Sequence, residues 1–269
     1  MLISVGILTG CGSIWDDEEA CALSDPDCST WTPTPGTSAP ASEAPSTGPS
    51  DRLLLQWRMT GGFAGLGGPG SIPEFSLYAD GRAYAMRRGD VDSPVDSLAE
   101  FQLRPDALTR LLRDARAAGL ERSRTAGAED VADAQILEIT MGSARTRVSQ
   151  PESQATDPAV RMWKRLQPYA WPTADQEASP RPYLPLQVAV LAGETTSSGK
   201  TIKPWPLAPL GKGERAARGI CTVFTHLDSV TARDLAQSNV VWASQGKTYS
   251  VRLRPMLPNE HTCKDIART

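Results

Sequence analysis

A long stretch dominated by serine, threonine and proline limits folding to the rest of the chain. Of the 22 positions from Ser29 to Ser50, 15 are one of these three residues. Such a composition cannot bury enough apolar surface to offset the entropy lost on ordering, so it predicts a disordered, semi-extended tether. A flexible coil over Gly12–Ser50 would span roughly 35 Å r.m.s.. We therefore expect the packed part of the protein to begin at residue 51.

The residues before the tether have the pattern of an export signal. Met1–Gly10 is a short apolar segment that ends in small residues, and Cys11 follows it directly. The tetrapeptide Leu8-Thr9-Gly10-Cys11 resembles the lipobox of bacterial lipoproteins, in which the signal is cut just before a lipidated cysteine. This resemblance implies loss of residues 1–10, a diacylglyceryl group on Cys11, and a lipidated tether over residues 11–50. It departs from the pattern because no lysine or arginine precedes the apolar segment. The alternative is an accidental hydrophobic N-terminus with Cys11 buried in the fold.

The remaining cysteines favour a protein that works outside the cytoplasm. Once Cys11 is set aside, Cys21, Cys28, Cys221 and Cys263 remain, and an even number can pair completely in three ways. We expect the local pairing, Cys21–Cys28 in the tether and Cys221–Cys263 in the folded part. Six residues separate Cys21 from Cys28, which is too wide for a CxxC redox pair or a zinc knuckle. Disulfides persist in oxidising compartments, which agrees with export.

Residues 51–172 are expected to form an α+β domain with an antiparallel sheet. Leu53–Trp57 predicts a strand, and Glu74–Met86 predicts a hairpin with Asp80-Gly81 in a type I′ turn. A second hairpin is expected at Gln135–Val148, around Gly142-Ser143.

Two helices complete the predicted order ββαββα. Arg104–Ala118 has leucines at i, i+3 and i+4, Pro105 in its first turn and Gly119 at its end. A short helix after Asp157, which can cap it, is expected to end before Pro168.

A smaller α+β domain is expected over residues 181–269, after a proline-rich link at Tyr169–Pro185. Its predicted elements are a strand at Leu186–Leu191, a helix from Asp228 or Ser229 to about Gln237, and a hairpin over Val240–Leu253 that turns at Gln245-Gly246. The sequence leaves open whether the two domains pack as one.

Two glycine-rich motifs resemble nucleotide-binding loops but lack the helix that such loops require. Gly65–Gly70 matches G-x-G-x-x-G, and Gly193–Thr201 resembles a P-loop with five residues, instead of four, between its glycines. Both kinds of loop bind phosphate at the N-terminus of a helix, and prolines after each motif oppose a helix here. We predict ordinary loops and no cofactor.

Neither the histidines nor the acidic residues form a recognisable catalytic or metal-binding pattern. The only histidines are His226, which forms an i, i+2 pair with Asp228, and His261 in the last loop. Side chains at i and i+2 of a helix do not face each other. A site assembled from distant segments is the alternative. We interpret the remaining acidic clusters as solvated turns, at Asp90, Asp92, Asp96, Glu129, Asp130 and Asp133. We assign no catalytic residue and no metal ligand.

Two further features could form interaction surfaces. Arg110, Arg113 and Arg116 share the exposed side of the longer predicted helix, which we interpret as a solvated face, with an anionic envelope polymer as the alternative partner. Trp205 and the loop Phe63–Ile72 carry apolar side chains that we expect to fill the core, with an exposed binding surface as the alternative. The net charge of −3 argues against binding to nucleic acid.

As a whole, the chain is similar to uncharacterised surface lipoproteins of actinobacteria. The similarity rests on the lipobox, the tether, the hairpin Tyr78-Ala79-Asp80-Gly81 and the C-terminal Arg254-Pro255-Met256-Leu257-Pro258 that leads to Cys263. It implies attachment through Cys11 to the outer face of the cell membrane, and no substrate or active-site residue. We therefore expect a non-enzymatic binding or envelope-associated protein. The alternative is a lipid-tethered secreted hydrolase.

Overall fold

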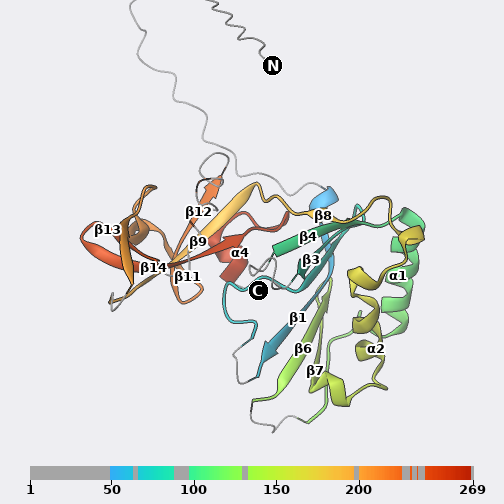
Figure 1. Cartoon of the computed structure of the whole chain (residues 1–269). Helices are drawn as coiled ribbons and strands as arrows, with labels where there is room; N and C mark the ends of the chain where they lie inside the picture. The colour runs from blue at the N-terminus through green and yellow to red at the C-terminus, as the bar shows by residue number, and fades with distance from the viewer. Residues whose placement is uncertain are drawn as a thin grey trace, which may run out of the picture. The chain divides into compact units, whose positions relative to one another are not determined.

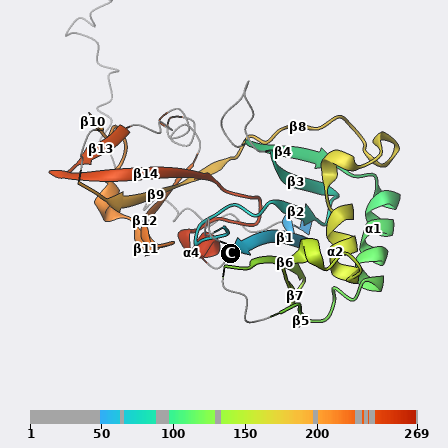
Figure 2. The same ribbon diagram turned by 60° about the horizontal axis from the view of Figure 1, so that its bottom comes forward.

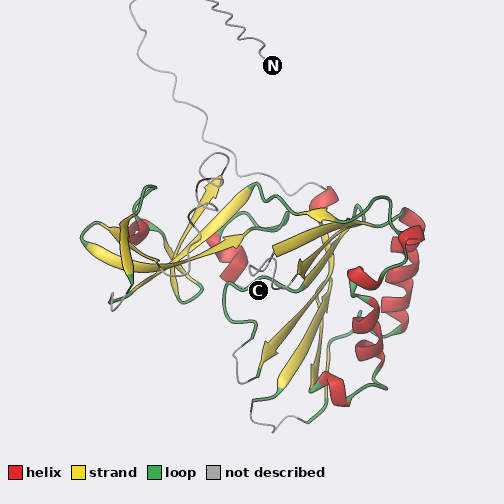
Figure 3. Cartoon of the chain, viewed as in Figure 1, coloured by secondary structure: helices red, strands yellow, loops and turns green. Residues whose placement is uncertain are grey.

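The computed structural model describes residues 49–62, 66–87, 97–128, 133–196, 200–225, 231, 235 and 240–267. The predicted export signal, tether, Cys11 and the Cys21–Cys28 pair lie outside these residues. The described part contains more strand than helix and forms two sheets, so the α+β class is confirmed (Figures 1 and 3). Both sheets belong to one unit, which spans Glu43–Thr269.

The first sheet has eight strands in the order β5-β7-β6-β1-β2-β3-β4-β8. In Figure 2 these strands lie one above another. The strands are β1 (Leu53–Gly61), β2 (Phe75–Tyr78), β3 (Arg82–Arg87), β4 (Ser97–Gln102), β5 (Arg124–Ala126), β6 (Gln135–Met141), β7 (Ala144–Ser149) and β8 (Arg181–Pro182). Neighbouring strands are antiparallel except β5 and β7.

Four strands precede the first helix, so the predicted order ββαββα does not describe this sheet. Two strands before the second helix were not predicted, β4 ahead of α1 and β5 after it. In β4, Leu98 packs in one hydrophobic cluster, while Phe101 packs in the main core. Because apolar side chains are buried on both faces of β4, the strand lacks the alternation that identifies a half-buried strand.

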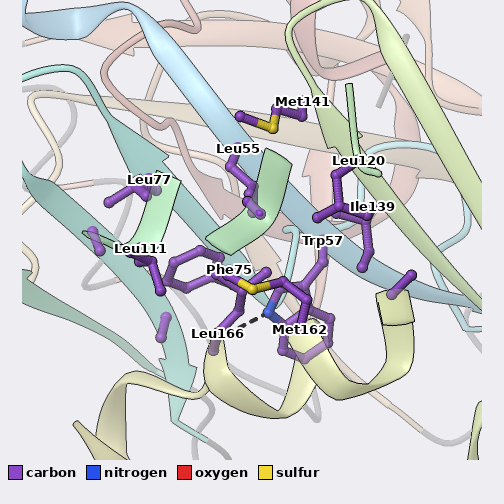
Figure 4. Close-up of a cluster of buried hydrophobic side chains, with 14 of the residues drawn as sticks. Leu55, Trp57, Phe75, Leu77, Leu111, Leu120, Ile139, Met141, Met162 and Leu166 are labelled. Carbon is purple, nitrogen blue, oxygen red and sulfur yellow. Dashed lines mark hydrogen bonds between the residues drawn. The ribbon is translucent and has the colours of Figure 1, made fainter. Parts of the chain in front are cut away.

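Helices α1 (Pro105–Ala117) and α2 (Pro158–Arg165) lie on the same side of the first sheet (Figure 1). Both were predicted, and Gly119 follows α1 with φ +80°, a backbone conformation that glycine adopts without strain. Alternate residues of the central strands meet these helices in the main core, drawn in Figure 4: Leu55, Trp57, Phe75, Leu77, Leu111, Leu120, Ile139, Met141, Met162 and Leu166.

The turn between β2 and β3 is not the predicted type I′ turn. Such a turn needs positive φ at both central residues. Here Gly81 has φ +85°, whereas the φ angle of Asp80 is not positive. The Gly81 N–H donates to the Tyr78 carbonyl, and Asp80 accepts from the backbone N–H of Arg82. This is a three-residue hairpin with glycine in the left-handed position, in which Asp80 keeps an ordinary conformation.

The second sheet has six strands in the order β10-β13-β14-β9-β12-β11. Its strands are β9 (Gln187–Glu194), β10 (Thr201–Pro204), β11 (Glu214–Ala216), β12 (Gly219–Thr225), β13 (Val240–Ser244) and β14 (Lys247–Pro255). The predicted strand at Leu186–Leu191 and the hairpin turning at Gln245-Gly246 are confirmed. The helix predicted from Asp228 falls almost entirely outside the described residues.

The predicted Cys221–Cys263 disulfide is present, with 5.9 Å between the two Cα atoms. It joins β12 to the short helix α4 (Cys263–Ala267) near the C-terminus. Both cysteines are buried and pack with Leu191 and Met256 in a cluster on one face of the second sheet. The disulfide therefore fixes the last helix against the strands.

The proline-rich segment at Tyr169–Pro185 packs against the first sheet. Arg181–Pro182 forms β8 beside β4, and Gln176 forms a bridge with Leu103. Trp171 packs against the main core. The segment thus completes an edge of the first sheet before the chain enters the second.

A buried ion pair lies where the end of β14 meets the loop between β1 and β2. The Arg254 guanidinium donates to both carboxylate oxygens of Glu260, at 2.5 and 2.7 Å, and to the Ser71 carbonyl at 3.4 Å. Both side chains of the pair are only 2% exposed. Nearby, the Tyr78 hydroxyl donates to the Asn259 side chain and the Tyr183 hydroxyl donates to the Met256 carbonyl. These bonds tie the C-terminal segment to the first sheet.

Arg58 brings a further buried charge to the same region. Its side chain is on β1 opposite Glu138 of β6, and the residue is 5% exposed. Burial lowers the pKa of its guanidinium, although the negative charges of Glu138 and Glu74 act in the opposite direction. Its Nη2 atom has no hydrogen-bond partner in the described part of the protein. We call this region, where the end of β14 meets the first sheet, the junction. Among the described residues it contains two buried arginines, and of these two only Arg254 has a carboxylate partner at hydrogen-bond distance.

Replacing Glu260 with alanine should strongly destabilise the protein, because it leaves the Arg254 charge buried and unpaired. We expect a loss of about 3–5 kcal/mol in the free energy of unfolding, measured by urea denaturation. The double variant Arg254→Met, Glu260→Leu should recover most of that loss. Glu121→Ala breaks an exposed pair with Arg116 and is the matched control, with an expected change below about 1 kcal/mol. Equal losses for Glu260→Ala and Glu121→Ala would contradict the importance of the buried pair.

Asp157→Ala should destabilise α2 by about 1 kcal/mol, because the carboxylate accepts from the Ala159 N–H at 2.8 Å and caps the helix. The hydrogen bonds from Arg124 lower the pKa of Asp157 below its ordinary value. The contribution is therefore present above the unfolded-state pKa, about 3.9, and is lost as pH falls through the lower folded-state pKa. Asp157→Asn keeps a capping oxygen and should cost less. Thermal unfolding between pH 2 and 7 measures both variants, and a cost that does not shrink in acid would contradict this role.

Candidate functional site

A cavity of about 450 Å³ lies between the C-terminal end of α2 and strands β1–β3, and we call it the aromatic cavity. Among the described residues, its lining contains aromatic, apolar and polar side chains, but no lysine, arginine or histidine. The lining residues are Trp57, Met59, Leu66, Glu74, Ala85, Met86, Gln135, Glu152, Trp163, Gln167, Pro168 and Tyr169. A concave site with large apolar walls and a few polar groups is the usual form of a small-molecule site.

Trp57 and Trp163 form the inner wall. Trp57 lies on the helix-facing side of β1, and its indole N–H donates to the Leu166 carbonyl at 3.2 Å, the dashed line in Figure 4. The Trp163 ring meets it edge-on, with ring centroids 5.8 Å apart. Each tryptophan therefore restricts the orientation of the other.

The end of α2 is held by three side-chain donors. Besides the Trp57 indole on the Leu166 carbonyl, Gln167 donates to the Trp163 carbonyl and the Trp171 indole donates to the Arg165 carbonyl. These bonds satisfy carbonyl groups that a helix end otherwise leaves without an intrahelical partner. The wall of the aromatic cavity is therefore built on a fixed helix terminus.

Tyr169 forms the outer wall and is 55% exposed. Its ring packs edge-on against Phe101, with centroids 5.1 Å apart. Partial burial raises the pKa of its phenol, although the charge of Arg87 acts in the opposite direction. Tyr169 is thus a neutral aromatic side chain at the mouth of the cavity near pH 7.

Two carboxylates complete the lining. Glu74 accepts a hydrogen bond from the backbone N–H of Met59 at 3.1 Å, which holds its side chain beside β1. Glu152 lies in the short 3-10 helix Pro151–Ser153 and is exposed. The described lining therefore contains two carboxylates and no basic side chain.

A second cavity, of about 350 Å³, contains His261 and bears on the hydrolase alternative. Its hydroxyl groups belong to Tyr84 and Tyr183, and no serine, threonine or cysteine is among its lining residues. Burial raises the pKa of Tyr84 to about 12, and it raises the pKa of Tyr183 further. Neither phenol is therefore an activated nucleophile near neutral pH.

The carboxylates of this second cavity are engaged in ion pairs. Glu260 binds Arg254, Glu100 binds Arg181, and Asp51 binds Arg82. His226 and Asp228 lie outside the described residues. Among the described residues that line the His261 cavity, none supplies the serine, threonine or cysteine nucleophile that acyl-transfer chemistry requires.

The three arginines on α1 each have an acidic neighbour. Arg110 pairs with Asp106 and Asp175, Arg113 lies 3.6 Å from Asp114, and Arg116 pairs with Glu121. A solvated helix face explains them. In the described residues, no group of three or more histidine, cysteine or acidic side chains is placed to hold a metal ion. Asp133 is described, whereas the other five acidic loop residues named above are not.

The described residues of the two glycine motifs form no helix, in agreement with the prediction. In the first, Leu66 forms a bridge with Gly61 and the chain continues to β2. In the second, β9 ends at Glu194 and strand β10 begins at Thr201. Strands therefore follow both motifs where a phosphate-binding helix would have to begin.

Trp205 belongs to the core, as expected. It is 8% exposed, meets Trp242 edge-on at 5.3 Å and donates its indole N–H to the Ala208 carbonyl. Of the loop Phe63–Ile72, the described Ile72 packs against a buried cluster. The alternative of an exposed binding surface at Trp205 is therefore wrong.

The aromatic cavity is the feature that the sequence did not predict. Trp163 lies within the helix predicted after Asp157, and Tyr169 lies in the segment predicted as a link, so neither was predicted to line a site. Glu74, Glu152 and Tyr169 are far apart in the chain, and no local motif connects them. The one local signal of the cavity is Pro168, because it marks the end of the helix and places Tyr169 directly after that end.

Comparison with protein-family models, curated proteins and solved structures finds no significant match. The residues and geometry of this chain therefore carry the functional argument. Among the described helices, none is long and apolar enough to cross a membrane.

Proposed function

We propose that the protein is a lipid-anchored, extracytoplasmic binding protein. In this proposal Cys11 carries a diacylglyceryl group, residues 11–50 are a tether, and the folded part binds a ligand on the outer face of the cell membrane. The observation that carries the proposal is the Cys221–Cys263 disulfide, because such a bond is typical of proteins that fold in an oxidising compartment. The lipobox-like Leu8-Thr9-Gly10-Cys11 supplies the means of attachment.

Two observations favour binding over catalysis. The aromatic cavity has walls fixed by hydrogen bonds and ring contacts, so a ligand would enter a preformed site. Among the described residues, the hydroxyl groups that line the His261 cavity belong to two tyrosines, and burial raises the pKa of both. The folded part therefore has the chemistry of a binding module more than that of a hydrolase.

Cys11→Ala should release the protein from the membrane. A diacylglyceryl cysteine inserts at least two acyl chains, and two chains hold firmly where one binds only reversibly. Fractionation of an actinobacterial host, with intact mass of each form, should place the wild type in the membrane with a lipid-sized mass increment. Cys11→Ala should be soluble and lack that increment.

Cys21→Ala is the matched control, because it removes a nearby cysteine and leaves the lipobox intact. It should remain in the membrane with the lipid increment. Wild-type protein that is soluble and unmodified would contradict the proposal, and so would membrane association of Cys11→Ala equal to that of the wild type.

A further inference from the structure

We propose that the aromatic cavity binds an organic cation, an ammonium group carried on a methylated or aliphatic body. The inference rests on the proposed binding role and names its ligand class. It does not depend on the lipid anchor, since the described residues that line the cavity all lie beyond residue 56, in the folded part.

The charge of the lining favours a cation over an anion. Among the described residues that line the cavity, Glu74 and Glu152 are the charged ones. The carbonyl groups at the end of α2 accept hydrogen bonds from Trp57, Gln167 and Trp171, so they add little to this preference. An anionic ligand would be repelled by the two carboxylates, whereas a cation would be attracted by them.

The aromatic walls select an organic cation over a metal ion. Trp57, Trp163 and Tyr169 supply π systems, and Met59 and Met86 supply polarisable thioethers. Aromatic rings attract ammonium groups that carry little hydration, and they are the usual walls of sites for quaternary ammonium ligands. A small metal ion would instead need a set of oxygen ligands around it.

The dimensions and exposure also suit such a ligand. A volume of about 450 Å³ lies in the range of small-molecule sites. Tyr169 at the mouth is more than half exposed, so it can close over a bound cation without disturbing the core. Glu152 is exposed, so its carboxylate can meet the ligand at little desolvation cost.

Arg58 and Arg87 are the opposing charges. Arg58 is buried on β1 and acts electrostatically on Glu74, and Arg87 acts on the Tyr169 phenol, although neither is among the residues that line the cavity. The exposed carboxylate of Glu152 is therefore the main source of the preference for a cation, and its variant is the decisive one.

Calorimetric titration of the full chain at low ionic strength tests the proposal with three probes. Choline carries a trimethylammonium group, and 3,3-dimethylbutan-1-ol is its neutral isostere. The methylamide of N-acetyl-lysine carries a primary ammonium of the kind found in proteins. We expect one molecule of choline or of the lysine derivative per chain, with the neutral alcohol at least about tenfold weaker than the better cation. The better cation distinguishes a small methylated ligand from a protein lysine.

Variants assign the binding to this cavity. Glu152→Gln should weaken the better cation by about threefold to tenfold, and Tyr169→Leu should weaken it by a similar factor. Glu121→Gln removes an exposed carboxylate that does not line the cavity and should change nothing. Thermal unfolding checks that each variant keeps its fold.

The proposal is overturned if neither cation binds, or if the neutral alcohol binds as tightly as choline. It is equally overturned if Glu121→Gln weakens binding as much as Glu152→Gln. None of these outcomes bears on membrane attachment, which the Cys11 experiment measures separately.

Discussion

The bidentate ion pair between Arg254 and Glu260 holds the segment through which the second sheet meets the first. Burying two charges carries a large desolvation penalty, so such a pair needs good hydrogen bonds to be favourable. Here the guanidinium reaches both oxygens of one carboxylate and the Ser71 carbonyl, and Glu260 also accepts from the Leu257 N–H, although the Arg254 Nε atom has no hydrogen-bond partner among the described residues. The pair joins residues of one segment, and the contacts of this region to the first sheet come from the Ser71 carbonyl, Tyr78 and Tyr183. We infer that the pair fixes the shape of this segment at the junction of the two sheets.

The aromatic cavity follows from a similar constraint at a helix end. Helix α2 is short, and its last carbonyls are satisfied by side chains from β1 and from the segment after the helix. These bonds orient Trp57, while Pro168, which cannot continue the helix, follows the end of α2 at Arg165 and leaves Tyr169 at the surface. The cavity therefore lies beside a helix end whose carbonyl groups accept hydrogen bonds from the indoles of Trp57 and Trp171.

The elements that were predicted correctly are those that a local signal in the sequence marks. Pro105, Gly119 and Asp157 mark helix ends, and the predicted Cys221–Cys263 pair is present. Strand β4 was missed because it is buried on both faces, and the β2–β3 turn was mistaken because only Gly81 takes positive φ. The candidate site was missed for a different reason. Glu74, Glu152 and Tyr169 meet only through tertiary packing, and Arg254 and Glu260 are typical surface residues by type.

Native-state hydrogen exchange tests most directly whether the junction makes the two sheets one cooperative unit. The slowest amides of β1 and β6 should open with the same free energy as those of β9 and β14, within about 1 kcal/mol, because both sets should exchange only on global unfolding. A second sheet that exchanges through a separate opening of much lower free energy, while β1 and β6 stay protected, would contradict the account.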